Sequence, residues 1–192
     1  MNEFTYIVGA TVEVQRGLAI WIEKIREYLD TYYQSDKENA KNTKFYRCMS
    51  KTEIISDDIF EKEQFIRGVI DDQNLLASIC IVQETGLLLN NNYTRCLEIE
   101  SLTNSPWNTI KYPLQEKRKG AATSLIEGII KEARSKEFSD ILKLITVPDE
   151  KEFYQSIGFE ETNGSGEMVL TSNAASMLLL DLEQKRNSTN FD

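Results

Sequence analysis

A short basic segment has the composition of a phosphate-binding loop. Lys117, Arg118 and Lys119 are followed by Gly120 and then by an amphipathic pattern that predicts a helix from Ala121 to Lys136. The first amides of a helix have no partner within it, and the helix dipole adds roughly half a positive charge there. Glycine lets the backbone approach a ligand closely. The segment therefore predicts a site that can hold a phosphate group, although a solvated basic turn before a surface helix is the alternative.

Two carboxylates close to this loop in the sequence are candidates for proton transfer. Glu98 and Glu100 lie two apart on a predicted strand, Cys96 to Leu102, so both side chains face the same side. A carboxylate beside an apolar channel can accept a proton directly or through water. Glu100, nearer the strand end, is the favoured base and Glu98 the second candidate. The alternative is that both are solvent-facing or ion-paired strand residues.

Residue types that the chain lacks exclude several classes of enzyme. There is no histidine, which excludes Ser-His-Asp, Cys-His and His-Glu-x-x-His zinc chemistry. No Walker A sequence and no Gly-x-Gly-x-x-Gly occurs, which disfavours nucleoside triphosphatases and nicotinamide enzymes. Cys48, Cys80 and Cys96 form no Cys-x-x-Cys, so we expect three reduced core residues and no bound metal.

Length and charge limit the organisation and the partners. The 192 residues suit a single domain, 1–192, with a divergent helical part at 1–43 and a C-terminal helix and tail at 172–192. A formal charge of −9 argues against nucleic-acid binding and mildly favours cationic partners such as amines. No apolar run approaches the ~18 residues that cross a membrane, and the first residues lack a signal-peptide pattern. We therefore expect a cytoplasmic protein without a membrane partner.

The elements of the first half must position these residues. The pattern predicts a helix over Thr11 to Tyr33 and a polar loop over Gln34 to Thr43. Strands at Phe65 to Ile70 and Leu75 to Val82 flank a hairpin turn, Asp71 to Asn74. A second turn is expected at Gly86 to Tyr93, which contains three consecutive asparagines.

The second half continues in a mixed α/β order. We expect a strand over Asp140 to Val147 closed by Pro148, a short helix over Glu150 to Ser156 with a cap at Gly158, and a hairpin over Phe159 to Thr171. A last helix starts near Ser172 or Asn173 and runs through Leu182, and the tail Lys185 to Asp192 is expected to fray. Apolar residues from Met177 to Leu182 nearly encircle this helix. It must be buried on this domain or on a second subunit, which makes a homodimer possible.

Two motifs resemble those of the GNAT superfamily of N-acetyltransferases. Lys117-x-x-Gly120-x-Ala122 resembles its acyl-CoA pyrophosphate loop, Arg/Gln-x-x-Gly-x-Gly/Ala. Phe153-Tyr154-x-x-x-Gly158-Phe159 resembles its later Phe-Tyr-x-x-x-Gly-Phe motif. The segment 105–108, Ser-Pro-Trp-Asn, is similar to an Ala-Pro-Trp-Asn element of one branch, and the resemblance covers roughly 44–170.

The sequence also departs from the GNAT pattern. Lys117 stands where Arg or Gln is usual, and Thr109 to Glu116 form an insertion before the loop. Val147 occupies a position where many members carry Asn. These departures concern side-chain contacts to the cofactor and leave the expected fold unchanged.

The resemblance implies a fold, a reaction and a set of roles. It implies a mixed, mostly antiparallel sheet flanked by helices and transfer of an acetyl group from acetyl-CoA to a primary amine by direct attack, without an acyl-enzyme. Tyr154 would donate a proton to the leaving sulfur, and Trp107 and Asn108 would border the acceptor pocket, unless Trp107 simply caps the core. The implied cofactor contacts are Leu102, Thr103, Lys117, Arg118, Lys119, Gly120, Ala121, Ala122 and Thr123.

Two other functions remain open at this point. A protein of the same fold could bind acyl-CoA without catalysis, if neither carboxylate is placed to deprotonate an amine. Alternatively, the chain could be an interaction protein that dimerises through Met177 to Leu182 and binds no cofactor. The acceptor also stays open between a small molecule and a protein.

Overall fold

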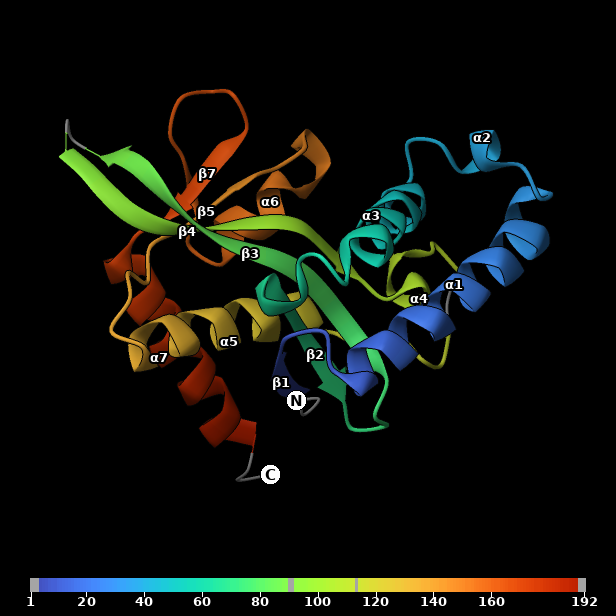
Figure 1. The fold of residues 1–192 in the computed structure, drawn as a ribbon, viewed down its shortest axis with the longest axis horizontal. Coiled ribbons are helices and arrows are strands. Elements are labelled where there is room, and N and C mark those ends of the chain that lie inside the picture. Colours follow the sequence, from blue (N-terminus) through green and yellow to red (C-terminus); the bar gives the residue numbers. More distant parts are fainter. Residues whose placement is uncertain (1–3, 90–91, 113, 190–192) are drawn as a thin grey trace. The chain divides into compact units, whose positions relative to one another are not determined.

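The computed structural model describes residues 4–89, 92–112 and 114–189 (Figure 1). Within them, strands form one sheet in the order β1-β2-β3-β4-β5-β7-β6. β4 pairs with β5 in parallel, whereas β1 with β2, β2 with β3, β5 with β7 and β6 with β7 pair in antiparallel fashion. The fold class is therefore the predicted one, a mixed and mostly antiparallel sheet with helices. The strands are β1 Phe4–Val8, β2 Ile66–Asp71, β3 Leu76–Leu89, β4 Asn92–Asn104, β5 Leu142–Ile145, β6 Glu160–Glu161 and β7 Glu167–Leu170.

Helices connect these strands. The helices are α1 Val12–Tyr33, α2 Lys37–Ala40, α3 Lys44–Asp58, α4 Pro106–Thr109, α5 Ala121–Ser135, α6 Pro148–Ser156 and α7 Ser172–Thr189, with a 3-10 turn at Glu63–Phe65. None of them, within the described residues, is long and apolar enough to cross a membrane.

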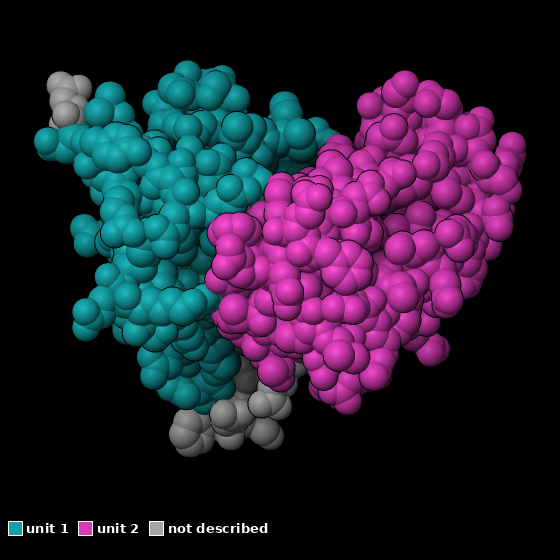
Figure 2. Space-filling model, viewed as in Figure 1, with its two compact units in different colours: residues 1, 82–100, 126–192 teal, residues 2–81, 101–125 magenta. Residues whose placement is uncertain are grey.

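The chain divides into two compact units (Figure 2). Unit 1 contains residues 1, 82–100 and 126–192, and unit 2 contains residues 2–81 and 101–125. β3, β4 and α5 each contribute residues to both units. One domain over 1–192 stays a prediction.

Unit 2 is built on two helices that begin at threonine caps. The side chain of Thr11 accepts a hydrogen bond from the amide of Val14 at the start of α1, and Thr43 accepts one from Tyr46 at the start of α3. The indole of Trp21 donates to the carbonyl of Leu76 at 2.9 Å, which fixes α1 on β3. The largest buried side chains of this core are Trp21, Phe45, Ile55, Ile66, Leu76, Ile79, Ile81 and Ile110.

The helix α3 and the strand β1 were missed in the sequence pattern. β1 has only five residues, and its burial does not alternate strictly. α3 carries lysine, arginine and aspartate among its apolar residues, so the helical stripe is weak in the sequence. The expected loop at 34–43 likewise contains the short helix α2, which Asp36 caps by accepting from the amide of Glu38. The part of 1–43 that was expected to be helical therefore also supplies an edge strand.

Unit 1 is organised around β5, β7 and the last helices. Cys96, Leu87 and Val169 form a small buried cluster. Cys48, Cys80 and Cys96 are all buried thiols that form no disulfide with one another, as predicted.

The turn expected at Gly86 to Tyr93 is wrong over most of its length, because β3 continues to Leu89 and β4 begins at Asn92. A Cβ atom at Gly86 would lie 1.8 Å from the hydroxyl oxygen of Tyr93, so glycine is required by a close approach rather than by a turn. Asn90 and Asn91 of the expected turn lie outside the described residues.

The last helix is longer than predicted. α7 continues to Thr189 instead of fraying from Lys185, and residues 190–192 lie outside the described part. The guanidinium of Arg186 donates two hydrogen bonds, at 2.9 and 2.7 Å, to the buried carboxylate of Glu127 on α5. Leu178 and Leu182 are buried, whereas Met177 and Leu180 are exposed in the single chain. The helix is therefore half covered by its own unit, and a partner for the other half stays a prediction.

Candidate functional site

The basic loop leads into α5 through a glycine in the left-handed region. Gly120 has φ +94°, and the carbonyl of Gly120 accepts from the amide of Ser124 at 2.8 Å. An added Cβ would meet only a ring carbon of Phe4 at 3.8 Å, so conformation rather than space requires glycine. In the described chain the amides of residues 120–123 donate to no protein acceptor. They are the backbone amides that every helix start leaves unpaired, and they can donate hydrogen bonds to a bound anion.

The three cations of the loop have different surroundings. The ammonium of Lys117 donates to the carbonyl of Ile110 at 2.6 Å, so it holds the loop closed. The guanidinium of Arg118 donates to the carbonyl of Gln115 at 2.9 Å and lies 3.7 Å from a carboxylate oxygen of Asp72. Lys119 is exposed and has no ion-pair partner within the described residues. Of the three expected ligand cations, Lys119 has the ammonium most available to an anion.

The element around Trp107 is part of the core of unit 2. Trp107 is 3% exposed and meets Trp21 edge to face, with ring centroids 6.4 Å apart. The side-chain oxygen of Asn108 accepts from the amide of Arg118 at 2.8 Å. These positions favour the core alternative for Trp107 and give Asn108 a role in shaping the basic loop. Their assignment to an acceptor pocket stays a prediction without support from the packing.

The strand β4 changes its pairing near its end. It pairs with β5 only through Leu97 and Glu98 in the described residues. Ser101 has φ +53°, which is unusual for a non-glycine residue inside a strand and marks a bulge-like interruption. Leu102 and Thr103, which follow it, are both buried. The regular strand geometry of β4 is therefore interrupted at Ser101, after its pairing with β5 has ended at Glu98.

The two candidate carboxylates on β4 are not equivalent. A carboxylate oxygen of Glu98 lies 3.0 Å from the ammonium of Lys143, its register partner on β5. Burial by itself lowers the pKa of Lys143, but the hydrogen bond with Glu98 outweighs it and raises that pKa above its ordinary value. Glu100 instead accepts a hydrogen bond from the side-chain amide of Gln83 at 3.1 Å. Glu98 is committed to an ion pair, whereas Glu100 carries a neutral partner.

The Phe-Tyr motif forms the end of α6. The amide of Phe159 donates to the carbonyl of Tyr154 at 3.0 Å, and that of Gly158 donates to Gln155 at 3.1 Å, with Gly158 at φ +98°. This is a Schellman cap, and the rings of Tyr154 and Phe159, 5.6 Å apart, make its apolar contact. Tyr154 is buried. The spacing of the motif is therefore explained by helix termination, and a role for the Tyr154 hydroxyl in proton transfer stays a prediction.

No protein-family model and no curated protein sequence matches the chain. A GCN5-related N-acetyltransferase from Anabaena variabilis is similar in structure, with 14% identity and a TM-score of 0.53 over 84% of this chain. The chain spans only 33% of the length of that protein.

Two other solved structures are similar over nearly the whole of both chains. A proposed acetyltransferase from Exiguobacterium sp. 255-15 is 15% identical, with a TM-score of 0.51 over 91% of this chain and 97% of that one. AtaT complexed with acetyl-methionyl-tRNAfMet is 9% identical, with a TM-score of 0.53 over 92% of this chain and 99% of that one. At these identities the likeness concerns the fold alone. The chain has the fold of the GCN5-related N-acetyltransferases.

Proposed function

We propose that the protein is an acyltransferase that uses acetyl-CoA to acetylate a primary amine. The observation that carries the proposal is the start of α5, where left-handed Gly120 is followed by amides without protein acceptors and preceded by the exposed ammonium of Lys119. A pyrophosphate fits such a site because it needs several hydrogen-bond donors and positive charge. The fold of the neighbours, which include acetyltransferases, supports the same function.

The end of β4 suits the amide-containing arm of acetyl-CoA. An extended chain that carries amides can add to an unpaired strand edge through main-chain hydrogen bonds. Leu102 lies on such an edge, since pairing of β4 with β5 stops at Glu98 in the described residues. Thr103 does not, because its carbonyl accepts from the hydroxyl of Ser78 on β3 at 2.9 Å. The carbonyl of Leu102 is occupied as well, by the ammonium of Lys51 at 2.8 Å, so we propose only the amide of Leu102 as the contact from β4 to this arm.

The reaction needs three further tasks from the protein. The acceptor ammonium must lose a proton, the developing oxyanion needs hydrogen-bond donors, and the leaving thiolate benefits from a proton. Glu100 is the better candidate base, because Glu98 is held in an ion pair with Lys143. Tyr154 is the candidate donor to the thiolate. Acetyl-CoA would supply the activated acyl group, and no metal is part of the proposal.

The acceptor is proposed only as an amine. AtaT is bound to acetyl-methionyl-tRNAfMet in one structure, and a mutant AtaT is bound to the C-terminus of its antitoxin and acetyl-CoA in another. For this chain a formal charge of −9 disfavours a nucleic-acid acceptor, since binding to phosphates requires a cationic surface. Polyamines, amino acids, peptides and protein lysines fit the charge better.

Turnover measurements test the proposal directly. The purified protein is incubated with acetyl-CoA and a panel of amines, peptides and aminoacyl-tRNA, and release of free thiol is followed together with the mass of the acceptor. The expected result is thiol release that depends on one amine class. Saturable binding of acetyl-CoA without any turnover would favour the non-catalytic alternative. Absence of binding by the folded protein would contradict the proposal and favour an interaction protein.

A further inference from the structure

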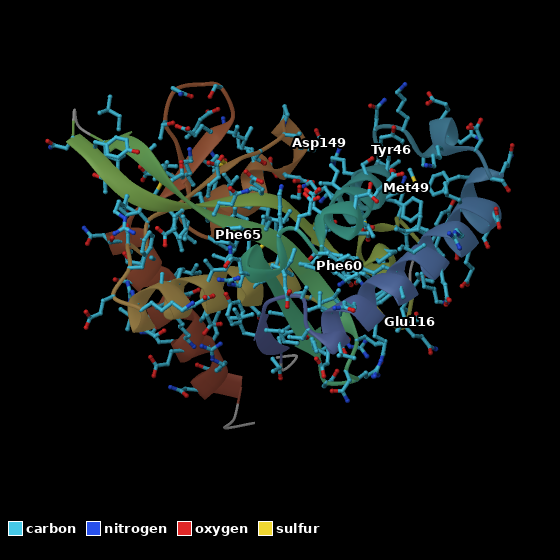
Figure 3. All side chains as sticks on the ribbon, in the orientation of Figure 1. Tyr46, Met49, Phe60, Phe65, Glu116 and Asp149 are labelled. Carbon is cyan, nitrogen blue, oxygen red and sulfur yellow. The ribbon has the colours of Figure 1, made fainter. Side chains whose placement is uncertain are left out.

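A pocket of about 280 Å³ lies between α1 and α3 in unit 2. Its apolar lining consists of Ile22, Ile25 and Leu29 of α1 and Met49 of α3, the last labelled in Figure 3. The three residues of α1 are three and four positions apart, so they share one face of the helix. None of the lining residues belongs to the basic loop or to β4. This α1–α3 pocket therefore shares no residue with the proposed acetyl-CoA site.

Charged side chains of both signs also line the α1–α3 pocket. Arg26 of α1 and Lys37 of α2 are cations, whereas Glu53 and Asp57 of α3 are anions. All four side chains are exposed, and within the described residues none of them has an ion-pair or hydrogen-bond partner. The pocket thus offers unpaired positive charge from α1 and α2 and unpaired negative charge from α3.

Two features of α3 favour a polar ligand over an empty pocket. Glu53 and Asp57 lie four positions apart on the helix, where two like charges repel each other, and a ligand cation would relieve that repulsion. Ser56 also lines the pocket, and its hydroxyl oxygen is buried without a hydrogen-bond partner in the part of the chain that the structure describes. A buried hydroxyl without a partner is unfavourable, so a ligand polar atom that reaches it would stabilise the protein.

The volume of the pocket limits the ligand to a small molecule. Ligand pockets usually measure about 300–1,000 Å³, and this one lies at the lower end of that range. Recognition of a peptide helix uses several side chains along a longer groove. The ligand must also be amphipathic, with an apolar group for Ile25 and Leu29 and with one charge of each sign.

We propose that the α1–α3 pocket binds a zwitterionic α-amino acid with an aliphatic side chain. The α-ammonium group contacts Glu53 and Asp57, and the α-carboxylate contacts Arg26 and Lys37. The aliphatic side chain packs on the apolar lining. This inference goes beyond the proposed transfer of an acetyl group and does not depend on it.

Titrations followed by NMR of methyl-labelled protein test the inference. The probes are L-leucine, leucinamide without the carboxylate, isocaproate without the amino group, and glycine without the aliphatic side chain. We expect L-leucine to shift the methyl signals of Ile25, Leu29 and Met49 saturably, with a Kd of the order of 1 mM, because the ligand is small. Each of the other probes should bind at least about threefold more weakly, because it lacks one of the three contacts.

Two variants assign the charged contacts. Arg26→Met should weaken L-leucine about threefold and leave leucinamide unchanged, because leucinamide has no carboxylate to lose a partner. Glu53→Gln should weaken L-leucine by a similar factor and leave isocaproate unchanged. Arg16→Met and Glu23→Gln are the matched controls, since both residues are exposed on α1 and neither lines the pocket. The controls should bind L-leucine as the wild type does.

Three results would overturn the inference. The first is the absence of saturable methyl shifts when L-leucine is added to the folded wild type. The second is equal affinity for L-leucine, leucinamide and isocaproate, which would show that the pocket recognises only the apolar group. The third is equal weakening by the pocket variants and their controls, which would assign the effect to the general field of the protein. Because no titration contains acetyl-CoA, these results do not depend on whether the proposed function is correct.

Discussion

Two helix ends in this protein contain a glycine in the left-handed region, and they differ in which backbone groups lack a hydrogen-bond partner. Gly120 precedes α5, and Gly158 follows α6, with φ +94° and +98°. The amides after Gly120 donate to no protein acceptor in the described chain, whereas the cap at Gly158 satisfies the carbonyls of Tyr154 and Gln155. Both belong to motifs that resemble the same superfamily. The motif at Gly120 leaves backbone amides without a protein acceptor, so it can bind a ligand. The motif at Gly158 is explained by packing and by termination of α6.

These two helix ends show that a matching sequence motif does not by itself identify a binding site. A sequence pattern marks a place where the backbone is constrained, and the hydrogen bonds decide whether the constraint serves a ligand or the fold. The start of α5 is the open region, and the packed region is α6 together with the α5–α7 contact in unit 1. Variants in the open region should change binding, and variants in the packed region should change stability.

The largest effect is expected for Gly120→Glu, which places bulk and negative charge at the helix start. We expect the Kd for acetyl-CoA to rise at least about 100-fold, because the orphan amides would face a carboxylate instead of a phosphate. Calorimetry measures the change. The matched control is Gly164→Glu, since Gly164 also has positive φ and its Cβ would meet nothing within 4 Å. Equal loss of binding in both variants would show that strain, and not the site, causes the effect.

A substitution at the end of α6 should lower stability and leave ligand binding unchanged. Gly158→Ala forces a side chain into the left-handed region and brings its Cβ to 3.3 Å from a methyl carbon of Leu170. We expect a loss of about 1–2 kcal/mol in the free energy of unfolding, measured in urea, with an unchanged Kd for acetyl-CoA. Gly164→Ala has positive φ in open space and isolates the strain from the packing. A large change in Kd without loss of stability would contradict the division into open and packed regions.

The contact between Glu127 on α5 and Arg186 on α7 should contribute to the free energy of unfolding in a way that depends on pH. Burial by itself raises the pKa of Glu127, but the hydrogen bonds from Arg186 and Lys131 outweigh it, so the pKa lies below its ordinary value. The carboxylate therefore contributes stability that is complete above the ordinary value of 4.5 and is lost as the pH falls through the lower folded value.

Glu127→Gln should therefore cost about 1 kcal/mol at neutral pH, because a buried charge-assisted contact is weakened. The difference from the wild type should shrink in acid, where the wild-type carboxylate is also neutral. Asp181→Asn, in an exposed pair with Lys185 on α7, is the matched control and should cost far less. A difference that stays constant from neutral pH into acid would show that the charge of Glu127 does not stabilise the fold.

The smallest effect is expected for Lys119→Ala in the open region. Loss of one exposed ammonium should weaken acetyl-CoA about 3- to 10-fold at low salt and reduce the salt dependence of binding. Lys111→Ala removes another exposed lysine that precedes the loop and should change the Kd by less. If both variants weaken binding equally, the general field of the protein, rather than a contact from Lys119, attracts the ligand.

Much of the local structure was predictable from short-range chemistry. Thr11 caps α1, Gly158 terminates α6, and the α5 helix starts at Ala121 as the pattern indicates. Caps and turns depend on hydrogen bonds between residues a few positions apart, so the sequence contains them. The basic loop followed from the same information, whereas the mostly antiparallel sheet was implied by the resemblance to the GNAT superfamily.

The tertiary structure decided which of the candidate groups are already occupied. It pairs Glu98 with Lys143, ties Lys117 to the carbonyl of Ile110 and brings Lys51 to Leu102. These partners lie in different segments of the chain, so no local pattern predicts the contacts. The sequence alone determined the helix ends and the donors that a helix start must expose. Only long-range packing decided where β4 stops pairing with β5 and which partners occupy the carbonyls of Leu102 and Thr103, because these contacts depend on which distant segments lie beside the strand.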